Sequence, residues 1–221
     1  MNYIDWGLVD YKEAWDRQEE IFEAKIARRL KGVSDIEQDF IVCEHPHVYT
    51  LGKSGKENNL LINDEFLEKI DAKYYRINRG GDITYHGYGQ IVGYPILDLE
   101  GLSLSLKEYI HCLEEAIIIT MREYGLETQR LDGATGVWLD AETNSPRKIC
   151  AIGVKASRYI TMHGFALNVN TDLNYFNYIN PCGFVDKGVS SMEKELGREV
   201  DMDEVKPKLY KNFLSIINNK S

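Results

Sequence analysis

The sequence lacks an apolar run long enough to cross a membrane, and its first residues lack the pattern of a secretory leader. No stretch approaches the roughly 18 apolar residues that a spanning helix needs. The opening residues, Met1 to Trp6, carry neither the basic nor the apolar segment of a signal peptide. We therefore expect a cytoplasmic protein that does not act at a membrane.

The chain also lacks a surplus of positive charge. Its 221 residues carry a formal net charge of −9, with 43% hydrophobic and 28% charged residues. A nucleic-acid-binding protein usually shows a basic surplus, so we expect no nucleic-acid partner. The composition is that of a globular protein, and the length suits a single domain over residues 1–221 with a sizeable core.

Several common chemical motifs are missing as well. No Gly-x-Ser-x-Gly elbow, Walker A loop or dinucleotide fingerprint is present. The cysteines form no Cys-x-x-Cys pair, and in a reducing compartment we expect free thiols. Histidine and cysteine spacings match no common zinc pattern, so no metal site is expected. The histidines and cysteines that could serve as metal ligands are His45, His47, His86, His111, His163, Cys43, Cys112, Cys150 and Cys182.

Hydrophobic spacing predicts three helices and a group of short strands between them. The helices are expected over 8–30, ended by Gly32, over 105–124 and over 202–217. Their clustering favours an α+β fold over a regular βαβ alternation. Strands are expected at 40–43, 48–51, 74–77, 91–99, 137–139, 149–156 and 165–169.

The segment 79–90 carries four glycines and His86 between two expected strands. Glycine allows positive φ and a close approach of the backbone to a ligand. On composition alone the segment is either an irregular turn or a binding loop.

A second segment is free of acidic residues from Thr143 to Thr171, although the chain as a whole is acidic. It contains Arg147, Lys148 and Lys155 within an apolar strand pattern. The pattern fits a local basic surface, and it equally fits a buried sheet whose lysine tips are solvated.

Cys182 lies between a proline and a glycine, whereas Cys43, Cys112 and Cys150 lie within apolar strands or a helix. An isolated cysteine is usually a small core hydrophobe. The bend around Cys182 makes it the one cysteine whose sulfur we expect at a cleft.

Taken together and in order, these segments resemble the octanoyl–acyl-carrier-protein:protein octanoyltransferases, also called lipoate-protein ligase B. The resemblance covers roughly residues 40–185 and departs at Tyr88, where the family usually has proline. The matching motifs are Glu44-His45-Pro46, Tyr49–Gly52, Arg79–Gly87, Gly89–Leu99, Lys148-Ile149, Gly153-Val154, His163-Gly164, Ala166–Asn170 and Asn180–Gly183.

The resemblance implies mixed β-sheets flanked by helices, in a catalytic domain like that of the biotin and lipoate ligases. It implies a catalytic pair of Cys182 and Lys148, with Lys148 at the start of its strand and not Lys155 closer to the cysteine. It also implies a substrate pocket made by Arg79, Gly80, Gly81, Asp82, Ile83, Thr84, Tyr85, His86, Ala151, Ile152, Gly153, Gly164, Phe165 and Ala166.

The implied reaction moves an octanoyl group from octanoyl-acyl carrier protein to the acceptor lysine of a lipoyl domain, with a Cys182 thioester as intermediate and no cofactor. The implied acceptors are the lipoyl domains of 2-oxoacid dehydrogenase complexes and the glycine cleavage H protein. Two alternatives stay open: an ATP-dependent lipoate or biotin ligase of the same fold, and a non-catalytic lipoyl-domain-binding protein.

Both implied partners are typically acidic, and so is this chain, which opposes their encounter. We therefore expect a local positive patch near the site. The candidates for it are Arg147, Lys155, Arg158, Lys53 and Lys56.

Overall fold

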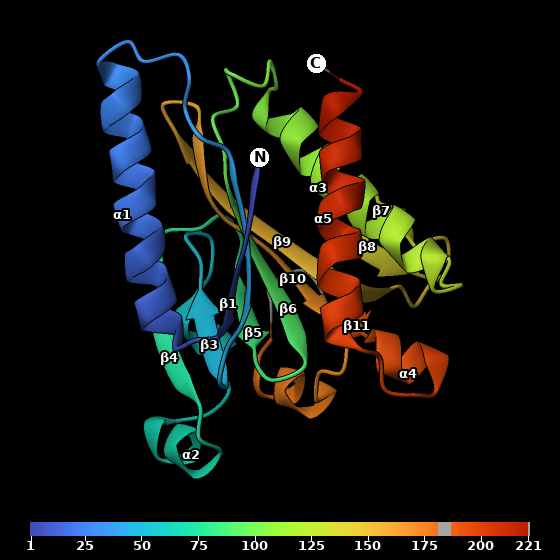
Figure 1. Ribbon diagram of the computed structural model, residues 1–221. Coiled ribbons are helices and arrows are strands. Elements are labelled where there is room, and N and C mark those ends of the chain that lie inside the picture. The colour runs from blue at the N-terminus through green and yellow to red at the C-terminus, as the bar shows by residue number, and fades with distance from the viewer. Residues whose placement is uncertain (181–186, 221) are drawn as a thin grey trace.

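The computed structural model describes residues 1–180 and 187–220. A large mixed sheet runs through the centre in the order β1-β2-β6-β10-β9-β8-β7, and the short β11 pairs with β9 (Figure 1). A smaller sheet, β4-β3-β5, lies beside it. The arrangement is α+β, as the sequence predicts.

The strands of the large sheet are β1 (Asn2–Leu8), β2 (Asp39–Glu44), β6 (Gln90–Ile96), β7 (Gln129–Leu131), β8 (Ala134–Leu139), β9 (Arg147–Ser157), β10 (Ile160–Asn168) and β11 (Gly188–Val189). Those of the small sheet are β3 (Val48–Leu51), β4 (Lys73–Arg76) and β5 (Ile83–His86). The β1–β2, β9–β11 and β3–β4 pairs are parallel, and the other pairs are antiparallel.

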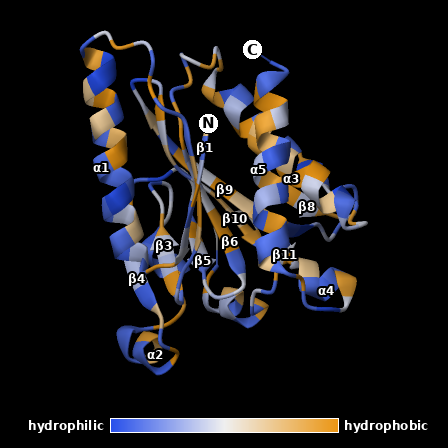
Figure 2. Cartoon of the chain, in the orientation of Figure 1, coloured by the Kyte–Doolittle hydropathy of each residue, from blue (hydrophilic) through white to orange (hydrophobic). Residues whose placement is uncertain are grey.

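Helices cover both faces of the large sheet (Figure 1). On one face lies α1 (Tyr11–Leu30), and on the other lie α3 (Leu106–Glu123) and α5 (Met202–Asn218). The apolar stripes of α3 and α5 are visible in Figure 2 and pack on the sheet around Phe40 and Phe213, whose ring centroids lie 5.1 Å apart. Two short helices, α2 (Asp64–Lys69) and α4 (Met192–Leu196), and the 3-10 turns η1 (Glu57–Asn59) and η2 (Leu173–Tyr178) complete the described elements.

Local sequence sets the ends of the long helices. A capping box closes the start of α3, where the Ser105 hydroxyl accepts from the Glu108 N–H and the Glu108 carboxylate accepts from the Ser105 N–H. Gly32, at φ +77°, follows the end of α1, as expected of a helix-terminating glycine. The sequence-based start of α1 at residue 8 was wrong, because Asp10 caps the helix and Leu8 belongs to β1.

The sequence also missed β1, β5, β7 and β11. β1 is a half-exposed edge strand in which Asn2, Asp5 and Gly7 interrupt the apolar residues, so it shows no continuous apolar run. β5 lies inside the glycine-bearing segment and pairs with β3 from Ile83 to His86. The segment is therefore a glycine turn at 79–81 followed by a strand.

No described helix is both long and apolar enough to cross a membrane.

Candidate active site

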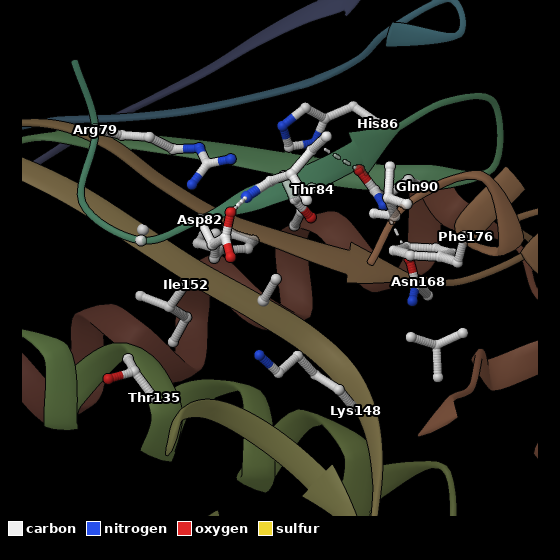
Figure 3. A pocket seen from close by; sticks show the side chains of 18 of the residues that line it. Arg79, Asp82, Thr84, His86, Gln90, Thr135, Lys148, Ile152, Asn168 and Phe176 are labelled. Carbon is white, nitrogen blue, oxygen red and sulfur yellow. Dashed lines mark hydrogen bonds between the residues drawn. The ribbon is translucent and has the colours of Figure 1, made fainter. Parts of the chain in front are cut away.

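A cavity of about 1170 Å³ lies between the two sheets. Arg79, Asp82, Thr84 and His86 reach it from the glycine-bearing segment, and Lys148 reaches it from the start of β9 (Figure 3). The two segments that the sequence singled out therefore meet at one cavity.

The cavity collects nearly all the residues expected in the pocket. Of the set expected from the resemblance, Tyr85 alone does not line it. Tyr85 lies between Thr84 and His86 on β5, and side chains next to each other along a strand point to opposite faces; Ile83, at the start of the strand, still reaches the cavity. Tyr85 is fully buried on the other face, where its hydroxyl lies 2.7 Å from His47 Nδ1 and its ring stacks on Tyr175.

Glycines let the glycine turn pack directly on β9. The Gly80 N–H donates to the Val154 carbonyl at 3.0 Å. A Cβ at Gly153 would lie 2.9 Å from the Gly80 oxygen and 3.2 Å from the Arg79 Cδ, closer than real Cβ contacts allow. Gly81 adopts φ +86°, a conformation that L side chains rarely adopt. These positions need glycine because two backbones meet there.

Arg79 is buried at the inner end of the glycine turn. Its Nη2 donates to the carbonyl and hydroxyl oxygens of Thr50 at 2.7 and 3.0 Å, and its Nη1 donates to the Gly80 carbonyl at 3.0 Å. Burial lowers the pKa of the guanidinium from its usual value. Within the described part of the chain, Arg79 Nε has no hydrogen-bond partner. The side chain thus keeps one donor for a bound group.

A chain of amides connects His86 to the strand beside Lys148. His86 Nδ1 lies 2.9 Å from Gln90 Oε1, the Gln90 amide donates to Asn168 Oδ1 at 2.9 Å, and the Asn168 amide donates to the Ser190 carbonyl at 3.0 Å. The Ser190 N–H in turn donates to the Lys148 carbonyl at 2.9 Å. The Gln90 amide nitrogen donates to Asn168, so the Gln90 oxygen faces His86 and accepts. His86 Nδ1 is therefore the donor in this hydrogen bond. The network links the two walls of the site.

Lys148 titrates close to neutral pH. Burial lowers its pKa to about 8, the nearby cations Lys187 and Arg79 act in the same direction, and the Cys150 thiol opposes them. The ammonium lies 4.5 Å from the centre of the Trp138 ring, a cation–π contact that favours the charged form. A lysine with a pKa near 8 can both donate and accept a proton close to pH 7.

The three described cysteines are buried in β2, α3 and β9, as expected of core residues. Burial raises the pKa of each thiol, so none is a ready thiolate. Cys182 lies outside the described residues. Asn180, two positions before it, and Lys187, five positions after it, both line the cavity.

The residues expected in a positive patch around the site lie outside the cavity lining itself. Arg147 forms ion pairs with Asp140 at 2.6 Å and with Glu195, so its charge is matched by acids from other segments. Lys155 lies 4.5 Å from the Phe22 ring of α1, and Arg158 lies in the β9–β10 turn, at the upper end of the sheet in Figure 1. None of Arg147, Lys155, Arg158, Lys53 or Lys56 lines the cavity.

The cavity is lined instead by cations that sequence reasoning passed over, Lys187 and Lys194. Trp138 and the amides of η2 were missed as well. A tryptophan within a strand pattern indicates core packing and not a site, so no local feature of the sequence distinguished it.

Comparison with solved structures defines the fold. The chain matches lipoate-protein ligase A bound with ATP at TM-score 0.72 and 15% identity, covering 98% of this chain and 85% of that one. It matches the bipartite lipoate protein ligase of Thermoplasma acidophilum at TM-score 0.71 and 15% identity, covering 98% and 83%. A biotin protein ligase of Aquifex aeolicus matches at TM-score 0.58 and 13% identity, covering 99% and 71%. The fold is that of the lipoate and biotin protein ligases.

Sequence comparison is more specific. The family model described as lipoyl protein ligase A/B catalytic domain matches residues 10–214. Curated relatives named octanoyltransferase are 58% identical in Bacteroides fragilis, over 98% of this chain and 97% of the relative, and 55% identical in Christiangramia forsetii, over 94% and 91%. The chain therefore belongs to the lipoyl protein ligase A/B catalytic-domain family, within its octanoyltransferase group, and it is an enzyme of the acyltransferase class.

Proposed function

We propose that this enzyme transfers an octanoyl group from octanoyl-acyl carrier protein to the acceptor lysine of a lipoyl domain, through a thioester on Cys182 with Lys148 as its partner. The observation that carries the proposal is Lys148, whose pKa is lowered to about 8 inside a cavity that Asn180 and Lys187 also line. In the sequence Cys182 follows Asn180 by two positions, and this supports the proposal.

The first half-reaction exchanges one thioester for another. The Cys182 thiolate attacks the octanoyl carbonyl carbon, and the bond to the pantetheine sulfur breaks. The Lys148 ammonium gives its proton to the departing sulfur, which leaves Lys148 neutral. A free cysteine is only a few per cent thiolate at neutral pH, and a neighbouring ammonium increases that fraction.

The second half-reaction forms the amide. The target lysine enters as a neutral amine, having released one proton to solvent, and it attacks the acyl-enzyme carbonyl. The neutral Lys148 accepts the second proton, which the attacking nitrogen loses as the amide forms. The amide bond forms as the bond to Cys182 breaks, and Cys182 returns as a thiolate beside the Lys148 ammonium. An amide is more stable than a thioester, so the transfer needs no ATP.

Two rival functions make different predictions. A ligase of the same fold would activate a free acid with ATP and would not need a cysteine. The octanoyltransferase name of the 55–58% identical relatives favours the transferase. A non-catalytic lipoyl-domain-binding protein would form no acyl-enzyme at all.

The test is mass spectrometry of the intact protein after incubation with octanoyl-acyl carrier protein and no ATP. One octanoyl mass, removable by hydroxylamine and absent in Cys182→Ser, is the expected result. An adduct on Cys43, Cys112 or Cys150, or activity that requires ATP, would contradict the proposal.

A further inference from the structure

The charge of the cavity lining is opposite in sign to that of the whole chain. The described lining residues include the cations Arg79, Lys148, Lys187 and Lys194, and their one acid is Asp82. Asp82 already accepts hydrogen bonds from the Asn59 amide at 2.7 Å and from the Ile83 N–H at 2.6 Å. In a chain of net charge −9, this lining favours an anionic ligand.

Three of these cations are buried or partly buried, namely Arg79, Lys148 and Lys187. Arg79 is held by Thr50 and Gly80, as described above. Lys148 and Lys187 share the ring of Trp138, with their ammonium nitrogens 4.5 and 5.6 Å from its centre. The proposed mechanism already uses Lys148 at the reacting thioester.

Lys194 stands apart from them. It is exposed on α4, and it lines both the main cavity and an adjoining hollow of about 390 Å³. Leu173 of η2 lines both spaces too, so α4 and η2 lie side by side at the outer end of the cavity. The hollow also contains Arg198, but Asp172 and Glu193 balance its cations. The positive surplus is therefore on the cavity side of Lys194.

Neutral donors accompany Lys194 at this end. Asn174 and Asn177 of η2 are exposed and line the cavity. Residues three apart in a 3-10 turn point to the same side, so both amides face the same space. A lysine with two side-chain amides is a donor set suited to a phosphate, whose oxygens accept hydrogen bonds.

We propose that Lys194, Asn174 and Asn177 bind the phosphodiester of the phosphopantetheine arm that carries the acyl group on its donor protein. The inference rests on the proposed function, since it takes the donor from there. The long arm separates the phosphate from the thioester. The cavity offers a cation for each end of the arm, because Lys148 is partly buried, as suits the thioester end, and Lys194 is exposed, as suits the phosphate end. The acceptor lysine carries no phosphate, so this subsite distinguishes donor from acceptor.

The test compares octanoyl-phosphopantetheine with octanoyl-pantetheine, two donors that differ only by the phosphate. Lys194→Gln should lower kcat/KM for the phosphorylated donor by about three- to tenfold, the scale of a partly screened charge-assisted contact. It should leave the unphosphorylated donor and the KM for the lipoyl domain unchanged. Lys211→Gln is the matched control, because Lys211 is exposed on α5 and does not line the cavity.

Direct binding of 4′-phosphopantetheine and pantetheine by calorimetry separates this inference from the proposed function. Wild-type protein should bind the phosphorylated compound more tightly, and Lys194→Gln should remove the difference even if no transfer is observed. Equal binding of the two compounds by wild-type protein, equal losses on both donors, or a changed acceptor KM would each overturn the assignment.

Discussion

Replacing Lys148 by arginine should separate the two half-reactions. Arginine keeps the positive charge that favours the Cys182 thiolate, but its pKa lies above about 12 and it cannot become a neutral base. A lysine with a pKa of about 8 is roughly one-tenth neutral at pH 7, against about one part in 3000 for a lysine at 10.5. The burial of Lys148 thus increases the available base about 300-fold, and arginine abolishes it.

In the arginine variant, octanoyl transfer from the acyl-enzyme to the lipoyl domain should fall by at least about 100-fold, the usual contribution of a general base. Formation of the acyl-enzyme should fall much less, because the cation remains. Quenched single-turnover reactions read by intact mass should therefore show the octanoyl adduct accumulating.

In the wild-type enzyme, the transfer step should accelerate with rising pH as Lys148 loses its proton, and it should level off above about pH 8. Lys155→Arg is the matched control on the same strand, because Lys155 lies against Phe22 on the α1 side. The reasoning fails if both half-reactions of Lys148→Arg fall equally, if Lys155→Arg is the more harmful change, or if the transfer rate is independent of pH.

Three further predictions concern stability. Burial lowers the pKa of His45 to about 4 and the pKa values of His86 and His163 to about 3, whereas the unfolded value is near 6.5. At pH values between the folded and unfolded pKa, the unfolded chain therefore binds more protons than the folded protein. Stability should then fall as the pH drops below about 6.5, by up to about 1.4 kcal/mol per pH unit for each histidine, and a melting temperature unchanged from pH 7 to pH 5 would contradict this. Gly164→Ala should cost about 1–3 kcal/mol in chemical denaturation, because its Cβ would overlap the Gly93 carbonyl and lie 2.7 Å from Pro95 Cδ, whereas Gly188→Ala meets only the flexible Arg147 side chain. Tyr88→Pro should raise the melting temperature by about 1–4 °C. The Gln90 N–H donates to the Gly87 carbonyl and Gly89 has φ +74°, so Tyr88 is the second residue of a type II turn, a position where proline is favoured. A lower melting temperature would show that the turn needs the tyrosine.

The same turn explains the one departure from the family motif. Tyr88 does not line the cavity, and its ring packs edge-on against His47 at 4.9 Å. The replacement of proline by tyrosine therefore changes a surface turn and leaves the lining of the cavity intact.

The sequence by itself determined the elements whose pattern is local. The strands around 40–43 and 149–156 and the helices over 105–124 and 202–217 carry continuous apolar runs or helical periodicity, and each was found. The glycine segment and Lys148 were also singled out, because the order of motifs along the chain can be recognised without the structure. The placement of Cys182 at the cleft and the roles of both catalytic residues stay predictions.

Only the tertiary structure decided the features that depend on distant partners. β1 is a strand because it pairs with β2, more than thirty residues away, and its seven residues contain no continuous apolar run that would predict it. Arg147 lies in the acid-free segment of the sequence, but in the structure it forms ion pairs with Asp140 and Glu195, which lie outside that segment. Lys194 and the η2 amides have no mark in the sequence, since a charged or amide side chain gains a role only from the space it faces. Charge acts across space and not along the chain, so folding decided which cations line the cavity.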